Sequence, residues 1–143
     1  MAYTLEQIRL ILGAGWLKKN DAGARIEQLL LDSRSITAPA GCLFFALPGQ
    51  RHDGHRFVAD AYRAGVRHFV VSRRLEGGLL PEANILLVPD TLAALQMLAS
   101  WHRRQFKLPV IGITGSNGKT IVKEWLSLLA HHFRIVLCPK SYK

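Results

Sequence analysis

The chain has 143 residues, 49% of them hydrophobic, so it can bury a core and does not have the composition of a disordered protein. No apolar run reaches the roughly 20 residues of a membrane-spanning helix, and the N-terminus lacks the layout of a secretory signal. The net charge of +9 suits anionic nucleotides as well as nucleic acid, but the basic residues are scattered and do not alternate with aromatic ones. We therefore expect a cytoplasmic protein without membrane insertion.

The N-terminal segment predicts a short helix. Thr4 can cap it, with Gln7 as the capping-box partner, and Gly13 or Gly15 can end it. Its apolar face has three members at helical spacing: Leu5, Ile8 and Leu12.

Strands and helices are expected to alternate after this helix, which indicates an α/β architecture. Apolar runs bounded by turn residues predict strands at 25–31, 43–47, 67–72 and 85–88. Between the second and the third run, a helical face is predicted that Gly65 can end; its members are Phe57, Val58, Ala61 and Tyr62.

A longer helix is predicted after Asp90, which can cap its N-terminus. Its inward face is expected to have five members: Leu92, Leu95, Leu98, Ala99 and Trp101. Residues 105–109 have the character of a linker. The two cysteines, Cys42 and Cys138, form no metal-binding or redox pair, so we expect reduced, buried thiols.

Residues 110–129 have the layout of a phosphate-binding loop between a buried strand and a helix. Gly115 and Gly118 allow positive φ angles, and the amide groups at the helix start can face phosphate oxygens. Lys119 would then reach the terminal phosphates, and the Thr120 hydroxyl would bind Mg²⁺. The common pattern has glycine where this chain has Ile113. The alternative is an ordinary strand–turn–helix in which Lys119 is a solvated side chain.

A further strand is predicted at 134–138. We expect residues 1–107 to form a complete N-terminal domain and residues 108–143 to form the incomplete start of an ATP-binding domain. A phosphate-loop domain needs more strands than about thirty residues can supply. The sequence therefore predicts a truncated protein that is inactive by itself.

Five motifs, in order along the chain, resemble those of the N-terminal part of the Mur ligase family. They are D-S-R at 32–34, L-F-F-A-L-P-G at 43–49, D-G-H-R-F at 53–57, A-Y-R-A-G-V-R-H-F-V-V at 61–71 and G-I-T-G-S-N-G-K-T at 112–120. The resemblance implies an ATP-dependent enzyme of peptidoglycan synthesis that forms an amide bond through an acyl phosphate. The phosphate loop and the V-K-E at 122–124 are most similar to the MurF type, which joins D-alanyl-D-alanine to UDP-MurNAc-tripeptide. Two strings are similar to versions of MurF that are fused to an alanine racemase: K-T-I-V-K-E-W-L and C-P-K-S-Y. Ile121 departs from the family, in which many members have a second threonine.

The resemblance also implies two sets of site residues. The first binds the UDP-linked precursor: Ser33 and Arg34 by the uridine diphosphate, Phe45, Ala46 and Leu47 beside the uracil, and Asp53, Gly54 and His55 in a loop that contacts ligand or supports the site. The second binds ATP phosphates and Mg²⁺: Thr114, Gly115, Ser116, Asn117, Gly118, Lys119 and Thr120, with Lys119 and Thr120 as the catalytic pair. Asp32 and Asp53 could instead only cap turns.

Other readings remain open. A ligase of the folylpolyglutamate type would share the phosphate loop but should lack the D-S-R and D-G-H motifs. The basic charge could mark a nucleic-acid-binding module, and the N-terminal part could be an assembly surface. We expect no nucleic-acid partner and no metal site built on His52, His55 or the 131–132 pair. The sequence leaves open the oligomeric state and the third residue of the acceptor peptide.

Overall fold

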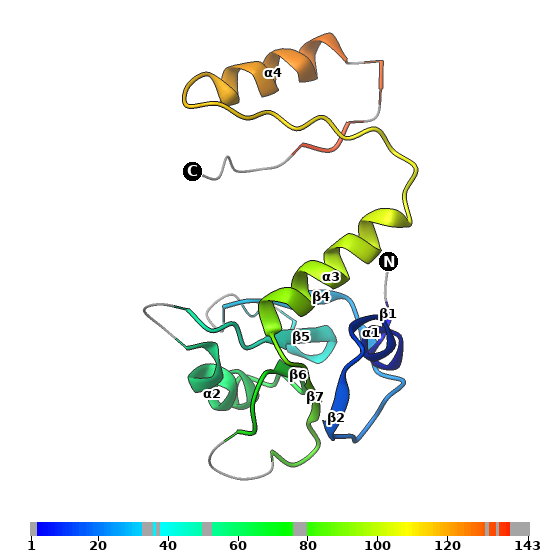
Figure 1. Cartoon of the computed structure of the whole chain (residues 1–143), viewed down its shortest axis with the longest axis vertical. Coiled ribbons are helices and arrows are strands. Elements are labelled where there is room, and N and C mark those ends of the chain that lie inside the picture. Colours follow the sequence, from blue (N-terminus) through cyan, green and yellow to red (C-terminus); the bar gives the residue numbers. More distant parts are fainter. Residues whose placement is uncertain are drawn as a thin grey trace. The chain divides into compact units, whose positions relative to one another are not determined.

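The computed structural model describes residues 3–32, 36, 38–49, 53–75, 80–130, 132–133 and 135–137. Contacts within the chain divide it into two compact units, Met1–Phe106 and Lys107–Lys143, called here the first and the second unit (Figure 1). Ser33, Arg34, His52 and Cys138 lie outside the described residues. None of the helices in the described ranges combines the length and apolar character that a bilayer span requires.

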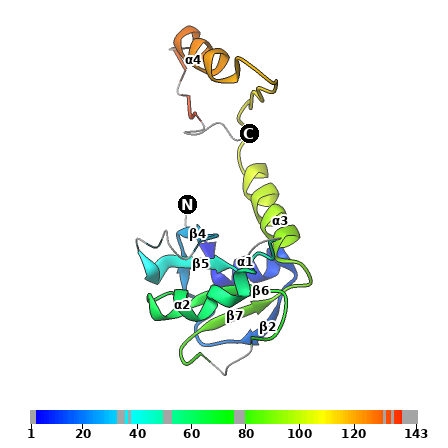
Figure 2. The same ribbon diagram turned by 90° about the vertical axis from the view of Figure 1, so that its left-hand side faces the viewer.

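The first unit is built on a five-stranded sheet, which confirms the predicted α/β class. Its strands are β2 (Gly15–Lys18), β4 (Gln28–Leu30), β5 (Cys42–Phe45), β6 (His68–Val71) and β7 (Asn84–Leu87), in the order β2-β7-β6-β5-β4 (Figure 2). β4, β5, β6 and β7 are parallel, and β2 is antiparallel to β7 at one edge. Every residue of β5 and β6 is buried, as expected for parallel strands that are covered on both faces.

Alternate residues of the strands supply two separate cores. Leu43, Phe45 and Val70 face the core that contains α1 (Leu5–Leu12) and α3 (Thr91–Arg104). Phe44 and Phe69 face the core of α2 (Val58–Arg63). The helices therefore lie on both faces of the sheet, in accordance with the two-residue period of a strand.

The start of the chain agrees with its prediction only in part. The capping box of Thr4 and Gln7 is present, and Gly13 ends α1 at a positive φ of 58°. The sequence did not predict β2. The strand predicted at 25–31 is also wrong as a single element. Its first part, β3 (Arg25–Ile26), pairs with β1 (Tyr3–Thr4) in a separate two-stranded sheet, and its second part is β4.

Asp90 caps α3 as predicted, because its Oδ1 accepts hydrogen bonds from the amides of Leu92 and Ala93 at 2.7 and 3.1 Å. The predicted inward face is only partly right. Leu98 is buried, but Leu92 is 47% exposed and Ala99 is exposed. The buried stripe is instead formed by Thr91, Ala94 and Leu98, since a helix that packs on one sheet face buries a single row spaced by three and four residues.

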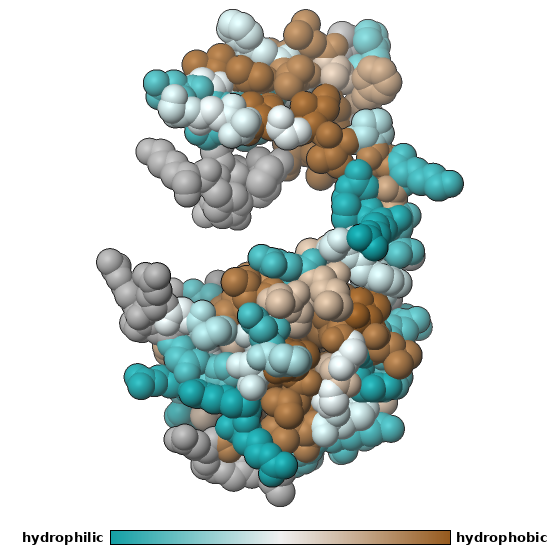
Figure 3. Space-filling view, in the orientation of Figure 1, coloured by the Kyte–Doolittle hydropathy of each residue, from teal (hydrophilic) through white to brown (hydrophobic). Residues whose placement is uncertain are grey.

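The second unit contains one regular element among its described residues, the helix α4 (Lys119–Leu129). The strand predicted before the phosphate loop is not formed, because residues 106–115 have no regular structure. Residues 135–137 of the strand predicted at 134–138 are not extended into a strand either. A strand needs the backbone groups of a neighbouring strand, and the described part of this unit holds no strand. Apolar side chains of α4 lie on the surface, including Trp125 at 65% and Leu129 at 77% exposure (Figure 3).

Candidate functional site

The candidate precursor site lies at the carboxyl edge of the parallel strands in the first unit. The chain leaves β5 through Ala46 and Leu47, and it leaves β6 through Ser72 and Arg73. Because β4, β5 and β6 run parallel, these segments emerge at the same edge as Asp32, two residues after β4. Ligands of open α/β sheets bind outside the carboxyl ends of the strands.

The three residues predicted at the end of β5 are not equivalent. Phe45 and Ala46 are completely buried, whereas Leu47 is half-buried. The Ala46 amide donates to the Val70 carbonyl at 3.0 Å. The first two side chains therefore belong to the packed cores, and among these three residues Leu47 has the side-chain surface that a ligand at this edge could touch.

Gly54 brings the D-G-H loop directly onto this strand end. Its amide donates to the Leu47 carbonyl at 2.8 Å, and Pro48 and Asp53 form a β-bridge at the base of the loop. A Cβ atom at position 54 would lie 2.6 Å from the Leu47 nitrogen and 2.7 Å from its carbonyl oxygen. Only glycine therefore fits this approach of two backbones.

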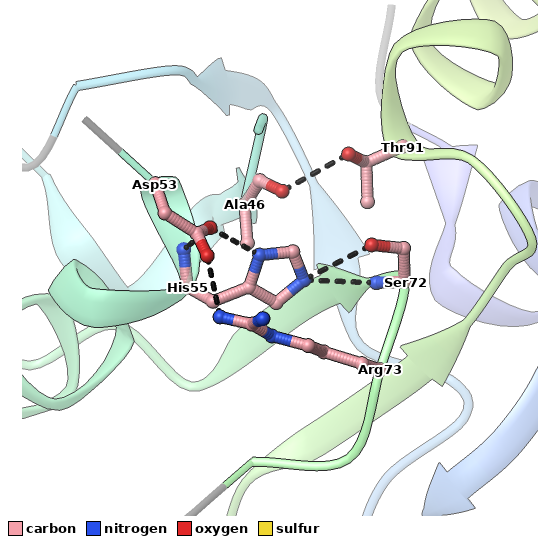
Figure 4. A network of polar contacts seen from close by, with 6 residues as sticks. All are labelled: Ala46, Asp53, His55, Ser72, Arg73 and Thr91. Carbon is pink, nitrogen blue, oxygen red and sulfur yellow. Dashed lines mark hydrogen bonds and ion pairs between the residues drawn. The ribbon is translucent and has the colours of Figure 1, made fainter. Parts of the chain in front are cut away.

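His55, in the 3₁₀ helix η3 (Gly54–Phe57), joins the loop to the end of β6 (Figure 4). Its Nδ1 lies 2.7 Å from Asp53 Oδ1, and its Nε2 lies 3.0 Å from the Ser72 amide nitrogen. A backbone amide can only donate, so Nε2 is the acceptor and Nδ1 carries the proton that is donated to Asp53. The imidazole is thus held as one neutral tautomer in a side chain that is 5% exposed.

Asp53 lies at the centre of this network. Its Oδ1 also accepts the His55 amide at 3.0 Å, and its Oδ2 pairs with the Arg73 guanidinium (Figure 4). The His55 amide, the His55 side chain and Arg73 together lower the pKa of the Asp53 carboxyl below its ordinary value. The carboxylate is therefore ionised at neutral pH.

The network contains the three side-chain types of a nucleophilic triad, Asp53, His55 and Ser72, but it cannot activate the serine. The Ser72 hydroxyl lies 3.2 Å from Nε2, yet the Ser72 amide already donates to the same nitrogen at 3.0 Å. The lone pair that would remove the serine proton is engaged in a structural bond. The D-G-H motif thus has a clear role in loop architecture, one of its two predicted roles.

The phosphate loop in the second unit has the predicted glycine conformations. Gly115 and Gly118 have φ angles of 147° and 75°. Gly118 precedes α4, and no side chain caps this helix start. A Cβ atom at Gly118 would meet nothing within 4 Å, so the space on that side of the Gly118 α-carbon is open. Thr114, Ser116, Asn117 and Thr120 are exposed.

The Lys119 ammonium group donates to the Gly115 carbonyl and so bends back over the loop. This contact places a positive charge beside the start of α4, where the first backbone amides of the helix lie. The loop therefore has the charge and backbone geometry of an anion site. In the described ranges, no group of three or more His, Cys, Asp and Glu side chains is arranged to hold a metal ion.

Three residues at this carboxyl edge were not predicted from the sequence: Ser72, Arg73 and Thr91. Thr91 Oγ1 donates to the Ala46 carbonyl at 2.9 Å (Figure 4). Ser72 ends the strand predicted at 67–72 and Arg73 follows it, and this place at a strand end of an α/β protein is the signal that could have identified them. Their partners lie 17 and 20 positions away in the sequence, so no local pattern joins them.

Comparison with known proteins agrees with this geometry. The family model described as "Mur ligase family, catalytic domain" matches residues 25–103. The chain belongs to the Mur ligase family.

Its similar curated relatives include UDP-N-acetylmuramoyl-tripeptide–D-alanyl-D-alanine ligases. The ligase of Synechocystis sp. is 41% identical over a match that covers 76% of this chain and 23% of that ligase. The ligase of Escherichia coli K12 is 39% identical over a match that covers 87% of this chain and 25% of that ligase. The chain thus spans about a quarter of the length of these relatives.

Solved structures of MurF are similar in fold. A crystal structure of MurF from Acinetobacter baumannii has a TM-score of 0.79 and 34% identity, with 92% of this chain and 28% of that chain covered. MurF from Thermotoga maritima, solved in complex with ADP, has a TM-score of 0.62 and 31% identity, with 76% and 24% covered.

Proposed function

We propose that this chain is part of an ATP-dependent ligase of the MurF type, which adds D-alanyl-D-alanine to UDP-MurNAc-tripeptide in peptidoglycan synthesis. The observation that carries the proposal is the likeness to MurF in both sequence and structure over most of this chain. The retained D-S-R and D-G-H motifs favour this type over a folylpolyglutamate-type ligase.

Residues 1–107 are proposed to recognise the uridine diphosphate end of the precursor. The proposed residues of this site are Ser33, Arg34, Phe45, Ala46, Leu47, Asp53, Gly54 and His55. Support comes from the common carboxyl edge that the described members share. Since Phe45 and Ala46 are buried, they would shape the floor of the site, and Leu47 would offer its partly exposed side chain.

Residues 108–143 are proposed to hold the phosphates of ATP through Thr114, Gly115, Ser116, Asn117, Gly118, Lys119 and Thr120. Bound with Mg²⁺, ATP would supply the phosphoryl group that activates the precursor carboxylate. The amides at the start of α4 would face the phosphate oxygens, and Lys119 would exchange the Gly115 carbonyl for a phosphate. Thr120 is an exposed residue, and its hydroxyl is the proposed Mg²⁺ ligand of this chain.

Calorimetry tests the precursor site. We expect UDP-MurNAc-tripeptide to bind the chain, UDP to compete with it, and MurNAc-tripeptide without the nucleotide to bind far more weakly. A chain that binds the two tripeptides equally would contradict uridine recognition. Salt-dependent binding of an oligonucleotide that UDP-MurNAc-tripeptide does not displace would instead favour the nucleic-acid alternative.

A further inference from the structure

Arg73 is an exposed cation that is held in place by a partly buried chain of hydrogen bonds. Its side chain is 60% exposed, and its Nη2 contacts Asp53 Oδ2. The other oxygen of Asp53 is held by the amide and by the ring of His55. The far side of that ring accepts the amide of Ser72, which precedes Arg73 in the chain (Figure 4).

This arrangement differs from an ordinary surface ion pair. An exposed ion pair of an arginine and a carboxylate usually contributes little to stability, because both side chains lose conformational entropy when they meet. Here the Asp53 carboxylate is already ordered by His55, whose side chain is only 5% exposed. The network thus orients the Arg73 guanidinium at the carboxyl edge while most of its side chain stays accessible.

The charges at this edge favour an anionic ligand. Asp53 is offset by Arg73, and the carboxylate of Asp32 is outnumbered by Arg56 and Arg74, which are exposed and adjoin His55 and Arg73 in the chain. A guanidinium presents five N–H donors in a planar fork that matches phosphate oxygens. An oriented fork with accessible donors is therefore suited to a diphosphate.

We propose that Arg73 binds the diphosphate of the UDP-linked precursor and that His55 and Asp53 are the positioning residues that aim it. This inference rests on the proposed function, which places the uridine diphosphate at this edge. It adds to the D-S-R segment a second source of positive charge, from the end of β6.

The experiment compares UDP with uridine, which lacks the diphosphate. Affinities are measured by calorimetry for wild type, Arg73→Gln and the matched control Arg74→Gln, which removes the same charge from the adjacent exposed position. We expect Arg73→Gln to weaken UDP binding about 10- to 100-fold, as for loss of a charge-assisted hydrogen bond. Uridine binding should change less than about twofold, and Arg74→Gln should alter UDP binding only by about twofold through general electrostatics.

A further variant tests the positioning role. His55→Gln should lower the ratio of UDP to uridine affinity in wild type but not in the Arg73→Gln background, because it acts through Arg73. Thermal unfolding of each variant checks that the fold is retained. An unchanged ratio for His55→Gln in the wild-type background would remove the positioning role.

The outcomes separate this inference from the proposed function. If wild type binds UDP and Arg73→Gln binds it equally well, the Arg73 assignment is wrong while uridine recognition stands. Equal losses in Arg73→Gln and Arg74→Gln would also overturn it, because they would indicate only the overall charge. If wild type binds neither UDP nor uridine, both proposals fail.

Discussion

The hydroxyl of Thr91 donates a 2.9 Å hydrogen bond to the backbone carbonyl of Ala46, and both residues are completely buried. Thr91 is the first residue of α3, and Ala46 directly follows β5. This bond therefore joins a helix start to the strand end on which the D-G-H loop rests.

Replacement of Thr91 by valine should destabilise the first unit. Valine keeps the shape and the methyl group but leaves the buried Ala46 carbonyl without this donor, at a cost of about 1–3 kcal/mol. Chemical denaturation measures the free energy of unfolding. Thr91→Ser keeps the hydroxyl and should lose only about 0.8 kcal/mol for the missing methyl. A valine variant as stable as wild type would show that the bond contributes nothing.

Alanine at position 54 should disturb the carboxyl edge of the sheet, where the proposed precursor site lies. Its Cβ atom would lie 2.6 Å from the Leu47 nitrogen, and backbone atoms cannot move away as a flexible side chain can. We expect a loss of about 1–3 kcal/mol or more in unfolding free energy, together with weaker UDP binding. Gly15→Ala is the control, because a Cβ there meets nothing within 4 Å. Equal stabilities of the two variants would be inconsistent with this packing.

The stability of the first unit should fall as the pH is lowered below about 6.5, the ordinary pKa of histidine. Burial lowers the pKa of His68 in the folded protein, against smaller opposing effects from the Ala40 backbone and Asp21. His68 therefore binds a proton more readily in the unfolded chain than in the folded one. The contribution of neutral His68 to the free energy of unfolding is complete above pH 6.5 and is lost as the pH falls from there towards the pKa of the folded state.

The local hydrogen bonds explain why a charged His68 is unfavourable. Asn84 Oδ1 accepts the amides of Asn20 and Asp21 at 2.8 Å, so its Nδ2 group faces His68 Nδ1 at 3.1 Å. A proton on His68 Nδ1 would make that nitrogen a donor too, so two N–H donors would face each other without an acceptor. Denaturation at pH 5 to 8 should give a smaller pH slope for His68→Gln than for wild type; identical slopes would exclude His68 as the source.

Lys119 should dominate nucleotide affinity within the second unit. Lys119→Ala removes the ammonium group beside the loop amides and should weaken binding of a fluorescent ATP analogue about tenfold or more. Fluorescence anisotropy provides the measurement. Lys123→Ala removes the same charge one turn later on α4 and should change affinity by about twofold. If the two variants lose the same affinity, Lys119 acts only through net charge.

Local signals in the sequence were sufficient for several elements. The box of Thr4 and Gln7, the cap of Asp90 and the positive φ of Gly118 each depend on residues within a few positions of one another. The apolar runs of β5 and β6 were equally clear, because buried parallel strands are apolar throughout. With the ordered motifs, these signals correctly predicted the α/β class and the family.

The failures have a different physical origin. β2 has a weak local pattern and is defined by pairing with β7, far along the chain. The run at 25–31 was divided because its two parts pair with different strands. The predicted strand before the phosphate loop has no partner among the described residues of its unit. Pairing partners, unlike caps, cannot be derived from a short window of sequence.

The network around Asp53 and His55 could not be predicted either, because its members are far apart in the sequence. The D-G-H motif was recognised, but its dependence on Ser72 and Arg73 follows only from the placement of β6 beside β5. The exposed position of Leu92 on α3 was missed for a related reason, since the sheet and not the helix selects the buried row.

The pairing of β2 with β7 has a consequence for synthesis of the protein. Gly15 lies opposite Leu87, so β2 has no neighbour in the sheet until β7, which follows it far along the chain, has also been synthesised. Until then, water hydrates the backbone N–H and C=O groups of residues 15–18 that later pair with β7. The addition of β2 to the sheet is thus a late step of folding during synthesis, because β7 is synthesised long after β2.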